Sequence, residues 1–330
     1  MTQRTLRFLS ARDVAQALPM REAVEAMKEA FRQLSAGEAV VPPRTYIESA
    51  GPQGDAIFMP SYVPAAGRMG LKVITLFGGN AALGLPRIQA IMLVLDAATG
   101  SQLAVMDGTS LTAIRTGAAS GAATDILARP DASVAAIFGA GPQAETQLEA
   151  VCVVRPIRRA RVFDASAERA AAFAREMASR LGIPVEAAAS ASAALAGADV
   201  VCTATTSPVP VFADADLAPG VHINAIGSYK PTVREVPGET VCRALVVVDH
   251  RLSAMAEAGD LLIPMAEGLI AKGTVFAELG EIIAGRKKGR ASADQVTLFK
   301  SVGVAVQDLL AADRVLANAA RLGLGTELAL

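Results

Sequence analysis

The chain has 330 residues, long enough for two domains of ordinary size, and its 52% hydrophobic and 19% charged residues are typical of a globular rather than a disordered protein. A net charge of -1, an aromatic content of 4% and the absence of tryptophan exclude a basic, base-stacking nucleic-acid binder, and no apolar run reaches the ~20 residues that a membrane span needs. The three widely spaced cysteines, Cys152, Cys202 and Cys242, indicate free thiols, and two histidines are too few for a histidine-rich metal centre, so we expect a cytoplasmic protein without a metal site.

The first third of the chain begins with helices, continues with strands and ends with a helix of small residues. Helical spacing of apolar residues over 10–37 is interrupted by Pro19 and ends at Gly37, which is suited to a helix C-cap. Another helix is expected from Thr109 or Ser110, and its small residues would allow a neighbouring backbone to pack closely. Strand-like runs, with no helix between them, stand at 45–49, 56–63, 70–77 and 88–100. These runs predict an antiparallel or mixed sheet.

Strand-like and helix-like segments alternate regularly from residue 131 to residue 250. This alternation is the pattern of a doubly wound α/β domain with a parallel sheet. The tail from about residue 295 reads as one amphipathic helix that ends at Gly323 and returns to the first domain. The sequence therefore predicts an α/β protein in which residues 119–306 form a Rossmann-type domain, and residues 1–118 and 307–330 form a second, α+β domain.

A glycine-rich segment, IFGAGPQA, follows an apolar strand and precedes a helix. In its Gly139-x-Gly141-x-x-Ala144 pattern, the first glycine makes a tight turn, the second lets the backbone approach a pyrophosphate, and the small third residue lets helix and strand pack. The pattern alone is weak in a chain with 28 glycines, but its place between a strand and a helix is the one that a dinucleotide site requires. We therefore expect a nicotinamide coenzyme, NADH or NADPH, in this domain.

Asp164, at the end of the next strand, lies 25 residues after the first glycine of this pattern. A carboxylate there accepts a hydrogen bond from the ribose 2′-hydroxyl and repels a 2′-phosphate, so Asp164 favours NADH over NADPH. Arg158, Arg159 and Arg161 stand nearby and could weaken that preference. The alternative interpretation of Asp164 is a solvated acid at a strand end.

Three basic residues of the first domain stand in otherwise apolar surroundings: Arg44 in VPPRTY, Lys72 in MGLKVITLF and Arg115 in SLTAIRTGAAS. A buried cation is costly unless it has an anionic partner. Together the three suggest a shared anion such as a substrate carboxylate, which arginine can hold with two parallel hydrogen bonds. The alternative is that each cation pairs with an acid of the protein or reaches water.

Seven short motifs, taken in order along the chain, resemble the ornithine cyclodeaminase/μ-crystallin family, which also includes an archaeal-type alanine dehydrogenase and ketimine reductases. The motifs are PPR (42–44), GLK (70–72), SLTAIRTGAAS (110–120), IFGAGPQA (137–144), HINAIGS (222–228), EAGDLLIP (257–264) and LFKSVGVAVQD (298–308). They cover nearly the whole chain. The series is specific for the family but not for one reaction within it.

The resemblance implies a homodimer built through the first domain, which would also bind substrate, and a Rossmann-type domain that binds the coenzyme. It implies a small-molecule amino-acid or cyclic-imine substrate whose carboxylate is held by Arg44, Lys72 and Arg115. Ser301 and Val302 match a segment that lies near nicotinamide and substrate. We expect coenzyme contacts at Arg115, Thr116, Gly139, Gly141, Pro142, Gln143, Asp164, Thr203, Thr205, Ile226, Gly227 and Ser228.

One position departs from the family pattern. In the cyclodeaminase and the alanine dehydrogenase, a catalytic aspartate follows the glycine of the INAIG strand by two residues, and here that position is Tyr229. Oxidative deamination needs a general base near Cα, and a tyrosine is a poor base at neutral pH. The ketimine-reducing members of the family likewise lack this aspartate. The resemblance therefore favours NAD(P)H-dependent reduction of Δ1-pyrroline-2-carboxylate or Δ1-piperideine-2-carboxylate to proline or pipecolate, with Lys72 as the proton relay.

Two other functions stay open at this point. Cyclodeamination of ornithine or dehydrogenation of an amino acid would require Lys72 or Glu235 to replace the missing aspartate. A non-catalytic protein that binds nicotinamide and a small ligand would need neither. The sequence does not choose between five- and six-membered rings, and Arg87, where relatives often carry a threonine near the coenzyme, either contacts a phosphate or points to solvent.

Overall fold

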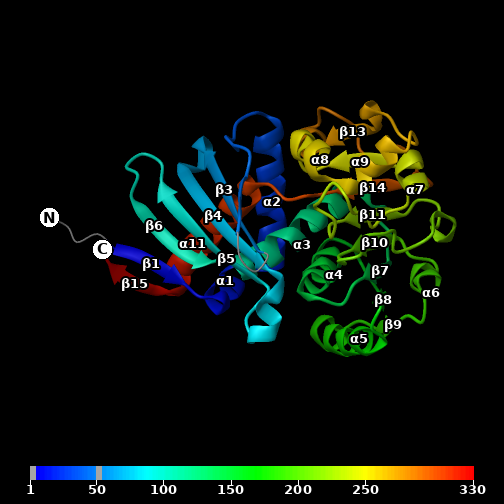
Figure 1. Cartoon of the computed structure of the whole chain (residues 1–330), viewed down its shortest axis with the longest axis horizontal. Helices are drawn as coiled ribbons and strands as arrows, with labels where there is room; N and C mark the ends of the chain where they lie inside the picture. Colours follow the sequence, from blue (N-terminus) through cyan, green and yellow to red (C-terminus); the bar gives the residue numbers. More distant parts are fainter. Residues whose placement is uncertain (1–4, 50–53) are drawn as a thin grey trace. The chain divides into compact units, whose positions relative to one another are not determined.

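A computed structural model describes residues 5–49 and 54–330. The chain forms two compact units: Met1–Arg115 together with Val304–Leu330 (unit 1), and Thr116–Gly303 (unit 2) (Figure 1). The first boundary between them falls inside one helix, α3 (Gly108–Leu127). Within the described ranges, none of the helices combines the length and the apolar character that crossing a membrane requires.

Unit 1 is built on a mixed sheet. Its described residues form seven strands in the order β15-β1-β6-β5-β4-β3-β2, in which β1 and β6 are parallel and the other neighbours are antiparallel. The prediction of an antiparallel or mixed sheet is therefore confirmed. The strands are β1 (Thr5–Leu9), β2 (Thr45–Glu48), β3 (Gly54–Val63), β4 (Arg68–Phe77), β5 (Ile88–Asp96), β6 (Gln102–Asp107) and β15 (Thr326–Ala329). The helices are α1 (Ala11–Ala17), α2 (Met20–Ser35), α11 (Ala305–Leu322) and the short 3-10 turns η1 (Pro64–Ala66) and η2 (Gly78–Leu83).

The two faces of this sheet differ. Helix α11 packs against α2 and against β3, β4 and β5. Lys72 and Met92, which are neighbours in the β4–β5 register, are buried, whereas the next neighbouring pair, Val73 and Ile91, is half-buried and exposed respectively. Because successive side chains in a strand point to opposite faces, one face of the sheet is covered and the other carries accessible apolar side chains.

The helix boundaries of unit 1 follow local chemistry. Ser10 caps α1 through a capping box with Asp13, and Gly37 adopts a φ of 72° just after α2, as expected. The prediction that Thr109 or Ser110 caps α3 is wrong. Asp107 Oδ1 accepts a hydrogen bond of 2.7 Å from the Ser110 N–H, while Thr109 Oγ1 accepts one of 3.1 Å from Ala90 N and so ties the helix to β5.

Every residue of unit 2 is described, and the unit forms an eight-stranded, wholly parallel sheet in the order β13-β12-β14-β11-β10-β7-β8-β9. The strands are β7 (Val134–Phe138), β8 (Arg159–Phe163), β9 (Val185–Ala187), β10 (Val200–Thr203), β11 (His222–Ala225), β12 (Leu245–Val248), β13 (Val275–Glu278) and β14 (Thr297–Lys300). The helices are α4 (Pro142–Val154), α5 (Ala167–Leu181), α6 (Ala191–Leu195), α7 (Gly238–Arg243), α8 (Arg251–Glu257), α9 (Gly259–Ala266), α10 (Leu279–Ile283), with 3-10 turns η3 (Asp214–Asp216) and η4 (Lys272–Thr274).

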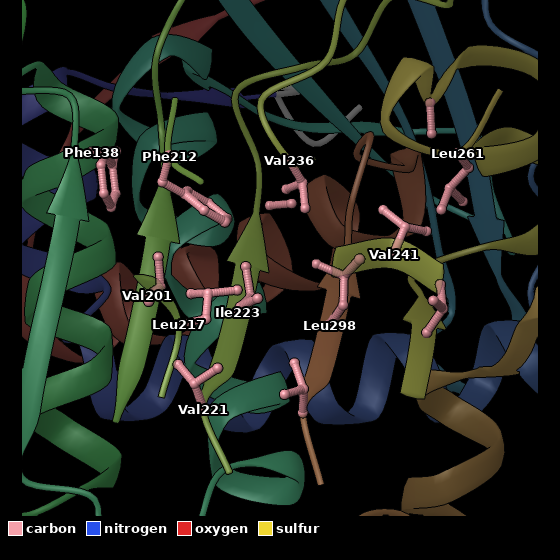
Figure 2. Close-up of a cluster of buried hydrophobic side chains, with 14 of the residues drawn as sticks. Phe138, Val201, Phe212, Leu217, Val221, Ile223, Val236, Val241, Leu261 and Leu298 are labelled. Atoms are coloured by element: carbon pink, nitrogen blue, oxygen red, sulfur yellow. The ribbon is translucent and has the colours of Figure 1, made fainter. Parts of the chain in front are cut away.

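Both faces of this parallel sheet are buried in apolar clusters. On one face, Val201, Ile223 and Leu298 from neighbouring strands pack with Val241 from α7 and Leu261 from α9 (Figure 2). The other face packs against α4 and α5 and includes Ile137, Leu148, Val162 and Phe173. A parallel sheet covered on both faces is the doubly wound α/β arrangement, so the predicted fold class is confirmed.

The prediction of one helix from residue 295 to Gly323 is wrong in its first part. Residues 297–300 form β14, a central strand between β11 and β12, and the helix α11 begins at Ala305. All four residues of β14 are buried. A strand buried on both faces has no alternating pattern, so its apolar run cannot be told from a helix by periodicity.

Candidate functional site

The glycine-rich loop of unit 2 has the geometry of a pyrophosphate cradle. Strand β7 ends at Phe138, and Gly139 turns with a φ of 100°. A Cβ added at Gly139 would lie 2.6 Å from the carbonyl oxygen of Ala204, so no side chain fits there. The Gly139 N–H donates to the carbonyl of Phe163 across 2.9 Å. The loop is therefore held against the ends of β8 and β10.

The N-terminus of α4 has room for a ligand. Gly141 is the N-cap and Pro142 the first helical residue, and no described side chain caps the helix. A Cβ added at Gly141 would meet no atom of the described residues within 4 Å, so packing within the protein does not require glycine there. Gln143 Oε1 is buried without a hydrogen-bond partner among those same residues. Because uncapped N–H groups at a helix N-terminus attract phosphate, these residues fit the pyrophosphate of a dinucleotide.

Asp164 is fixed beside this loop. Its Oδ2 accepts a hydrogen bond of 3.0 Å from Ala140 N, and its Oδ1 accepts bonds of 2.8 Å from Ser166 N and from Arg169 Nη2. A carboxylate has about four acceptor positions, so one is left for a ribose hydroxyl. Asp164 is therefore not the solvated strand-end acid of the alternative interpretation. Its cationic neighbour is Arg169, which the sequence analysis did not name.

The loops that follow β10 and β11 are tied together by one buried acid, Glu235. Glu235 Oε1 accepts bonds from Thr205 N (2.7 Å) and Thr205 Oγ1 (2.6 Å), and Oε2 accepts bonds from Thr203 Oγ1 (2.9 Å) and Ser228 N (3.1 Å). A Cβ at Gly227 would lie 2.6 Å from both Glu235 oxygens. The predicted coenzyme contacts Thr203, Thr205, Gly227 and Ser228 thus come together, with half-buried Ile226 between the strand and Gly227, but the hydroxyl of Thr203 is donated inside the protein.

Glu235 belongs to a buried charge cluster with Asp260 and Lys300. Lys300 Nζ lies 2.8 Å from Asp260 Oδ2 and also donates to the Ser228 carbonyl, while Asp260 Oδ1 accepts from the backbone N–H groups of Glu235 (2.7 Å) and Val236 (3.0 Å). Burial and the Asp260 carboxylate raise the pKa of Glu235, although its bonds from Thr205 oppose the shift. This role of Asp260 and Lys300 was not predicted from the sequence, although Asp260 lies in the motif EAGDLLIP and Lys300 in the motif LFKSVGVAVQD.

Asp249, just after β12, fixes the predicted Ser301–Val302 segment. Its Oδ2 accepts hydrogen bonds from Ser301 Oγ (2.7 Å), Val302 N (2.9 Å) and Gly303 N (2.8 Å). Because the Ser301 hydroxyl donates its proton to Asp249, its oxygen can act towards a ligand as an acceptor. These three bonds tie the end of unit 2 to the loop after β12.

Two of the three basic residues predicted in unit 1, Lys72 and Arg115, contact one acid, Asp308 of α11, which was not predicted from the sequence. Lys72 Nζ lies 2.8 Å from Asp308 Oδ2, and Arg115 Nε donates to Asp308 Oδ1 across 2.9 Å. Arg115 Nη1 donates to Gln307 Oε1 across 2.7 Å. Of the two interpretations left open, pairing with an acid of the protein therefore holds for Lys72 and Arg115, and binding of a substrate anion by the same cations stays a prediction.

The electrostatics of this cluster still favour an anion. Burial lowers the pKa of Lys72 to about 8; Asp308 opposes the shift, and the charges of Arg115 and Arg44 add to it. Burial alone would raise the pKa of Asp308, but Arg115 and Lys72 outweigh it and hold that pKa below its usual value. With Lys72 protonated, Lys72 and Arg115 together carry two positive charges beside the single negative charge of Asp308. A substrate carboxylate would lower this excess.

The remaining predicted residues lie as follows. Thr116 is buried and its carbonyl accepts a bond of 3.2 Å from Gln147 Nε2. A Cβ at the next residue, Gly117, would lie 2.4 Å from the Thr146 carbonyl oxygen, which confirms that the small residues let another backbone pack closely. Arg87 is exposed. Tyr229 is half-buried against the apolar cluster of Figure 2.

A metal centre is not visible in the described parts of the chain, since no group of three or more His, Cys, Asp or Glu residues there is arranged to hold an ion.

Comparison with known proteins gives the same family as the motifs. The model of the ornithine cyclodeaminase/mu-crystallin family matches residues 4–322. A Delta(1)-pyrroline-2-carboxylate reductase of Bacillus cereus is 39% identical over 318 residues, which are 96% of this chain and 98% of that protein. The Thermococcus litoralis Delta(1)-pyrroline-2-carboxylate reductase in complex with NADH and L-proline has a TM-score of 0.93 and 43% identity, and the match covers 97% of this chain and 99% of that one.

An archaeal alanine dehydrogenase dimer with bound NAD is nearly as similar in structure. Its TM-score is 0.92 at 36% identity, and the match covers 98% of this chain and 99% of that one. Relatives with different reactions therefore share this fold over their whole length. The family model, the full-length identities and the fold agree, and the chain belongs to the ornithine cyclodeaminase/mu-crystallin family.

Proposed function

We propose that this protein reduces a cyclic ketimine carboxylate, Δ1-pyrroline-2-carboxylate or Δ1-piperideine-2-carboxylate, to proline or pipecolate with NADH or NADPH. When bound, the coenzyme supplies the hydride. The chain must then bind the carboxylate, orient the ring and provide a proton for the nitrogen. The similarity to two Delta(1)-pyrroline-2-carboxylate reductases, one of them in complex with NADH and L-proline, supports this choice.

The observation that carries the proposal is that Lys72 is buried and that its pKa is lowered. Its side chain is 1% exposed and its pKa is lowered to about 8, so at neutral pH it is largely protonated yet close to losing its proton. Adding a hydride to the carbon of C=N leaves an electron pair on nitrogen, which takes up a proton. An ammonium with a pKa of about 8 is suited to hydrogen-bond that nitrogen and to pass the proton on.

Two residues that could support deamination, Tyr229 and Glu235, are not suited to be a base. Tyr229 stands at the position of the family aspartate and packs against apolar side chains. Glu235 is wholly buried, and its two oxygens accept four hydrogen bonds from Thr203, Thr205 and Ser228. A reaction that needs no strong proton acceptor therefore agrees best with these residues.

Arg44 and Arg115 are proposed to bind the substrate carboxylate together with Lys72. Arg115 is anchored by Asp308 and Gln307, so its guanidinium is held in a fixed orientation, and the group retains further N–H donors beyond those two bonds. Arg44 is half-buried just before β2 and lies near enough for its charge to affect Lys72. A substrate without a carboxylate would leave these cations without their proposed anion.

Unit 2 is proposed to bind the coenzyme. The cradle at Gly139, Gly141 and Gln143 fits the pyrophosphate, and Asp164 retains an acceptor position for the ribose. The loops anchored by Glu235 follow strands on the other side of β7, where a doubly wound sheet receives the nicotinamide half. Two similar structures contain NADH and NAD.

A homodimer through unit 1 is supported by the more accessible face of its sheet. Pro60, Leu71, Leu93 and Val105 lie side by side across β3, β4, β5 and β6, and Ile91 in the next row is 51% exposed. A continuous apolar sheet face of this kind is typical of an interface between subunits. The similar archaeal alanine dehydrogenase is a dimer.

The direct test is to incubate the protein with each cyclic imine and with NADH or NADPH, and to follow the nicotinamide absorbance. We expect oxidation of at least one coenzyme by at least one imine. Lys72→Met should lower the rate by about a hundredfold or more with coenzyme affinity little changed, since proton transfer contributes about that much. No oxidation with either imine and either coenzyme would contradict the proposal.

The alternative reaction is oxidation of an amino acid, as in dehydrogenases and cyclodeaminases of the family. The pKa of Lys72 also favours it under one condition, because above pH 8 the neutral amine can accept a proton. Release of ammonia from ornithine or alanine with NAD at alkaline pH would support this reading, whereas proline oxidation under the same conditions is the reverse of the proposed reduction.

A further inference from the structure

A cation covers the acid that would receive the coenzyme ribose. Asp164 Oδ1 and Arg169 Nη2 are 2.8 Å apart. The Asp164 side chain is 10% exposed, whereas that of Arg169 is 66% exposed. A nearly buried carboxylate is thus paired with a guanidinium that lies mostly in solvent. The Asp164–Arg169 pair lies next to the glycine-rich loop, because Asp164 also accepts a hydrogen bond from Ala140 N.

The backbone around this pair is held by hydrogen bonds, while the Arg169 side chain lies mostly in solvent. Ser166 caps α5 and its Oγ accepts the Arg169 N–H, and Asp164 accepts the Ser166 N–H across 2.8 Å. The first turn of α5 is therefore held in register with the loop. The guanidinium stands at the end of a long side chain that is 66% exposed, so its bond to Asp164 can be exchanged for one to a ligand without disturbing packed neighbours.

The ion pair with Arg169 alters the electrostatic repulsion between Asp164 and a coenzyme 2′-phosphate. An isolated carboxylate at this position repels a 2′-phosphate, which is the reason it selects NADH. With Arg169 beside it the pair has no net charge. Arginine remains charged at all relevant pH values, has five N–H donors, and binds phosphate through two parallel bonds.

We propose that Arg169 is the specificity-determining residue for the coenzyme, and that it lets this protein use NADPH as well as NADH. The inference rests on the proposed function, because it assumes a nicotinamide coenzyme on this loop. With NADH, Arg169 stays on Asp164 while the carboxylate accepts the ribose 2′-hydroxyl. With NADPH, the guanidinium turns from Asp164 to the 2′-phosphate.

The test measures the dissociation constants of NADH and NADPH by fluorescence titration, which requires no substrate. The wild-type protein should bind both. Arg169→Ala should lower the affinity for NADPH relative to NADH about ten- to a hundredfold, because a charge-assisted contact is lost and Asp164 is left uncovered. Arg169→Lys should keep most of the NADPH affinity. Arg175→Ala, an exposed arginine of the same helix, is the matched control and should not change the ratio.

Substitution of Asp164 tests the same inference from the other side of the ion pair. Asp164→Ala releases Arg169 and should shift the preference towards NADPH, and the double variant Asp164→Ala/Arg169→Ala should lose that shift. An unchanged affinity ratio in Arg169→Ala would overturn the inference while leaving the proposed function intact. If neither coenzyme binds the wild-type protein, both are overturned. If both bind but neither imine is reduced, only the reaction is wrong and the affinity ratios still decide the role of Arg169.

Discussion

Asp308 should set the pH at which the protein loses activity on the alkaline side. Lys72 and Asp308 are 2.8 Å apart and each is 1% exposed, so their interaction is little screened by water. Asp308→Asn removes the charge that opposes the effect of burial on Lys72 and keeps the size of the side chain. The pKa of Lys72, already lowered to about 8, must therefore fall further.

The size of the effect follows from the charges. At an effective dielectric constant of ~20, two unit charges about 4 Å apart interact by about 4 kcal/mol. At about 1.4 kcal/mol per pH unit this is about three units, and relaxation of the site reduces it, so we expect a fall of one to three units. Because the proposed imine reduction needs protonated Lys72, activity should be lost as pH rises through this pKa, and the variant should lose it at correspondingly lower pH.

The assay is the pH dependence of kcat/KM for the imine, with Asp313→Asn as control. Asp313 lies on the same helix and pairs with the partly exposed Arg68, so its loss should leave the alkaline limb in place. Breaking a buried pair costs about 3–5 kcal/mol, so folding of Asp308→Asn must be checked by circular dichroism, and Asp308→Glu serves as a variant that keeps the charge. A folded Asp308→Asn protein with an unmoved alkaline limb would refute the role of Lys72 as proton donor.

Three further results are expected. Gly141→Ala should leave the melting temperature unchanged, because its Cβ meets open space, yet weaken coenzyme binding by tenfold or more in a fluorescence titration; unchanged affinity would argue against the cradle. Ile91→Glu should convert dimers to monomers in analytical ultracentrifugation, since it puts a charge on the apolar face, and a dimeric variant would place the interface elsewhere. Burial lowers the pKa of His222 to about 3 from an ordinary 6.5, so its contribution to stability is complete above pH 6.5 and is lost progressively as pH falls towards 3. Between pH 6.5 and 5 this amounts to about 2 kcal/mol, so denaturant midpoints should fall more steeply with acid in the wild type than in His222→Asn.

The parts of the fold that the sequence predicts are those with a local pattern. Gly139 is predictable because a strand, a turn and a helix follow one another within a few residues, and Asp164 because it ends the next strand. Strand β14 is not predictable in this way. Its buried residues lack alternation, so its neighbours in the sheet, not its own pattern, decide its structure.

For the ion pairs that Lys72 and Arg115 form, the sequence predicted the cation but not the acid that it pairs with. Lys72 and Arg115 stand out because a cation in an apolar run is conspicuous. Asp308 does not, because its partner Arg115 is 193 residues away in sequence and an acid in a long amphipathic helix has the appearance of a solvated one. Glu235 is similar, since nothing near it in sequence shows that Thr203, 32 residues earlier, donates to it. Such pairs between residues far apart in sequence can be identified only from the three-dimensional structure.

The Glu235 anchor fixes the backbone next to position 229. Ser228 is held through its N–H by Glu235 and through its carbonyl by Lys300, so the backbone is fixed one residue before position 229. The side chain at position 229 can therefore be substituted without displacing the backbone of this loop. The resemblance to the family implies an aspartate at this position in its deaminating members, and the same anchored backbone would hold either that aspartate or the tyrosine of this chain.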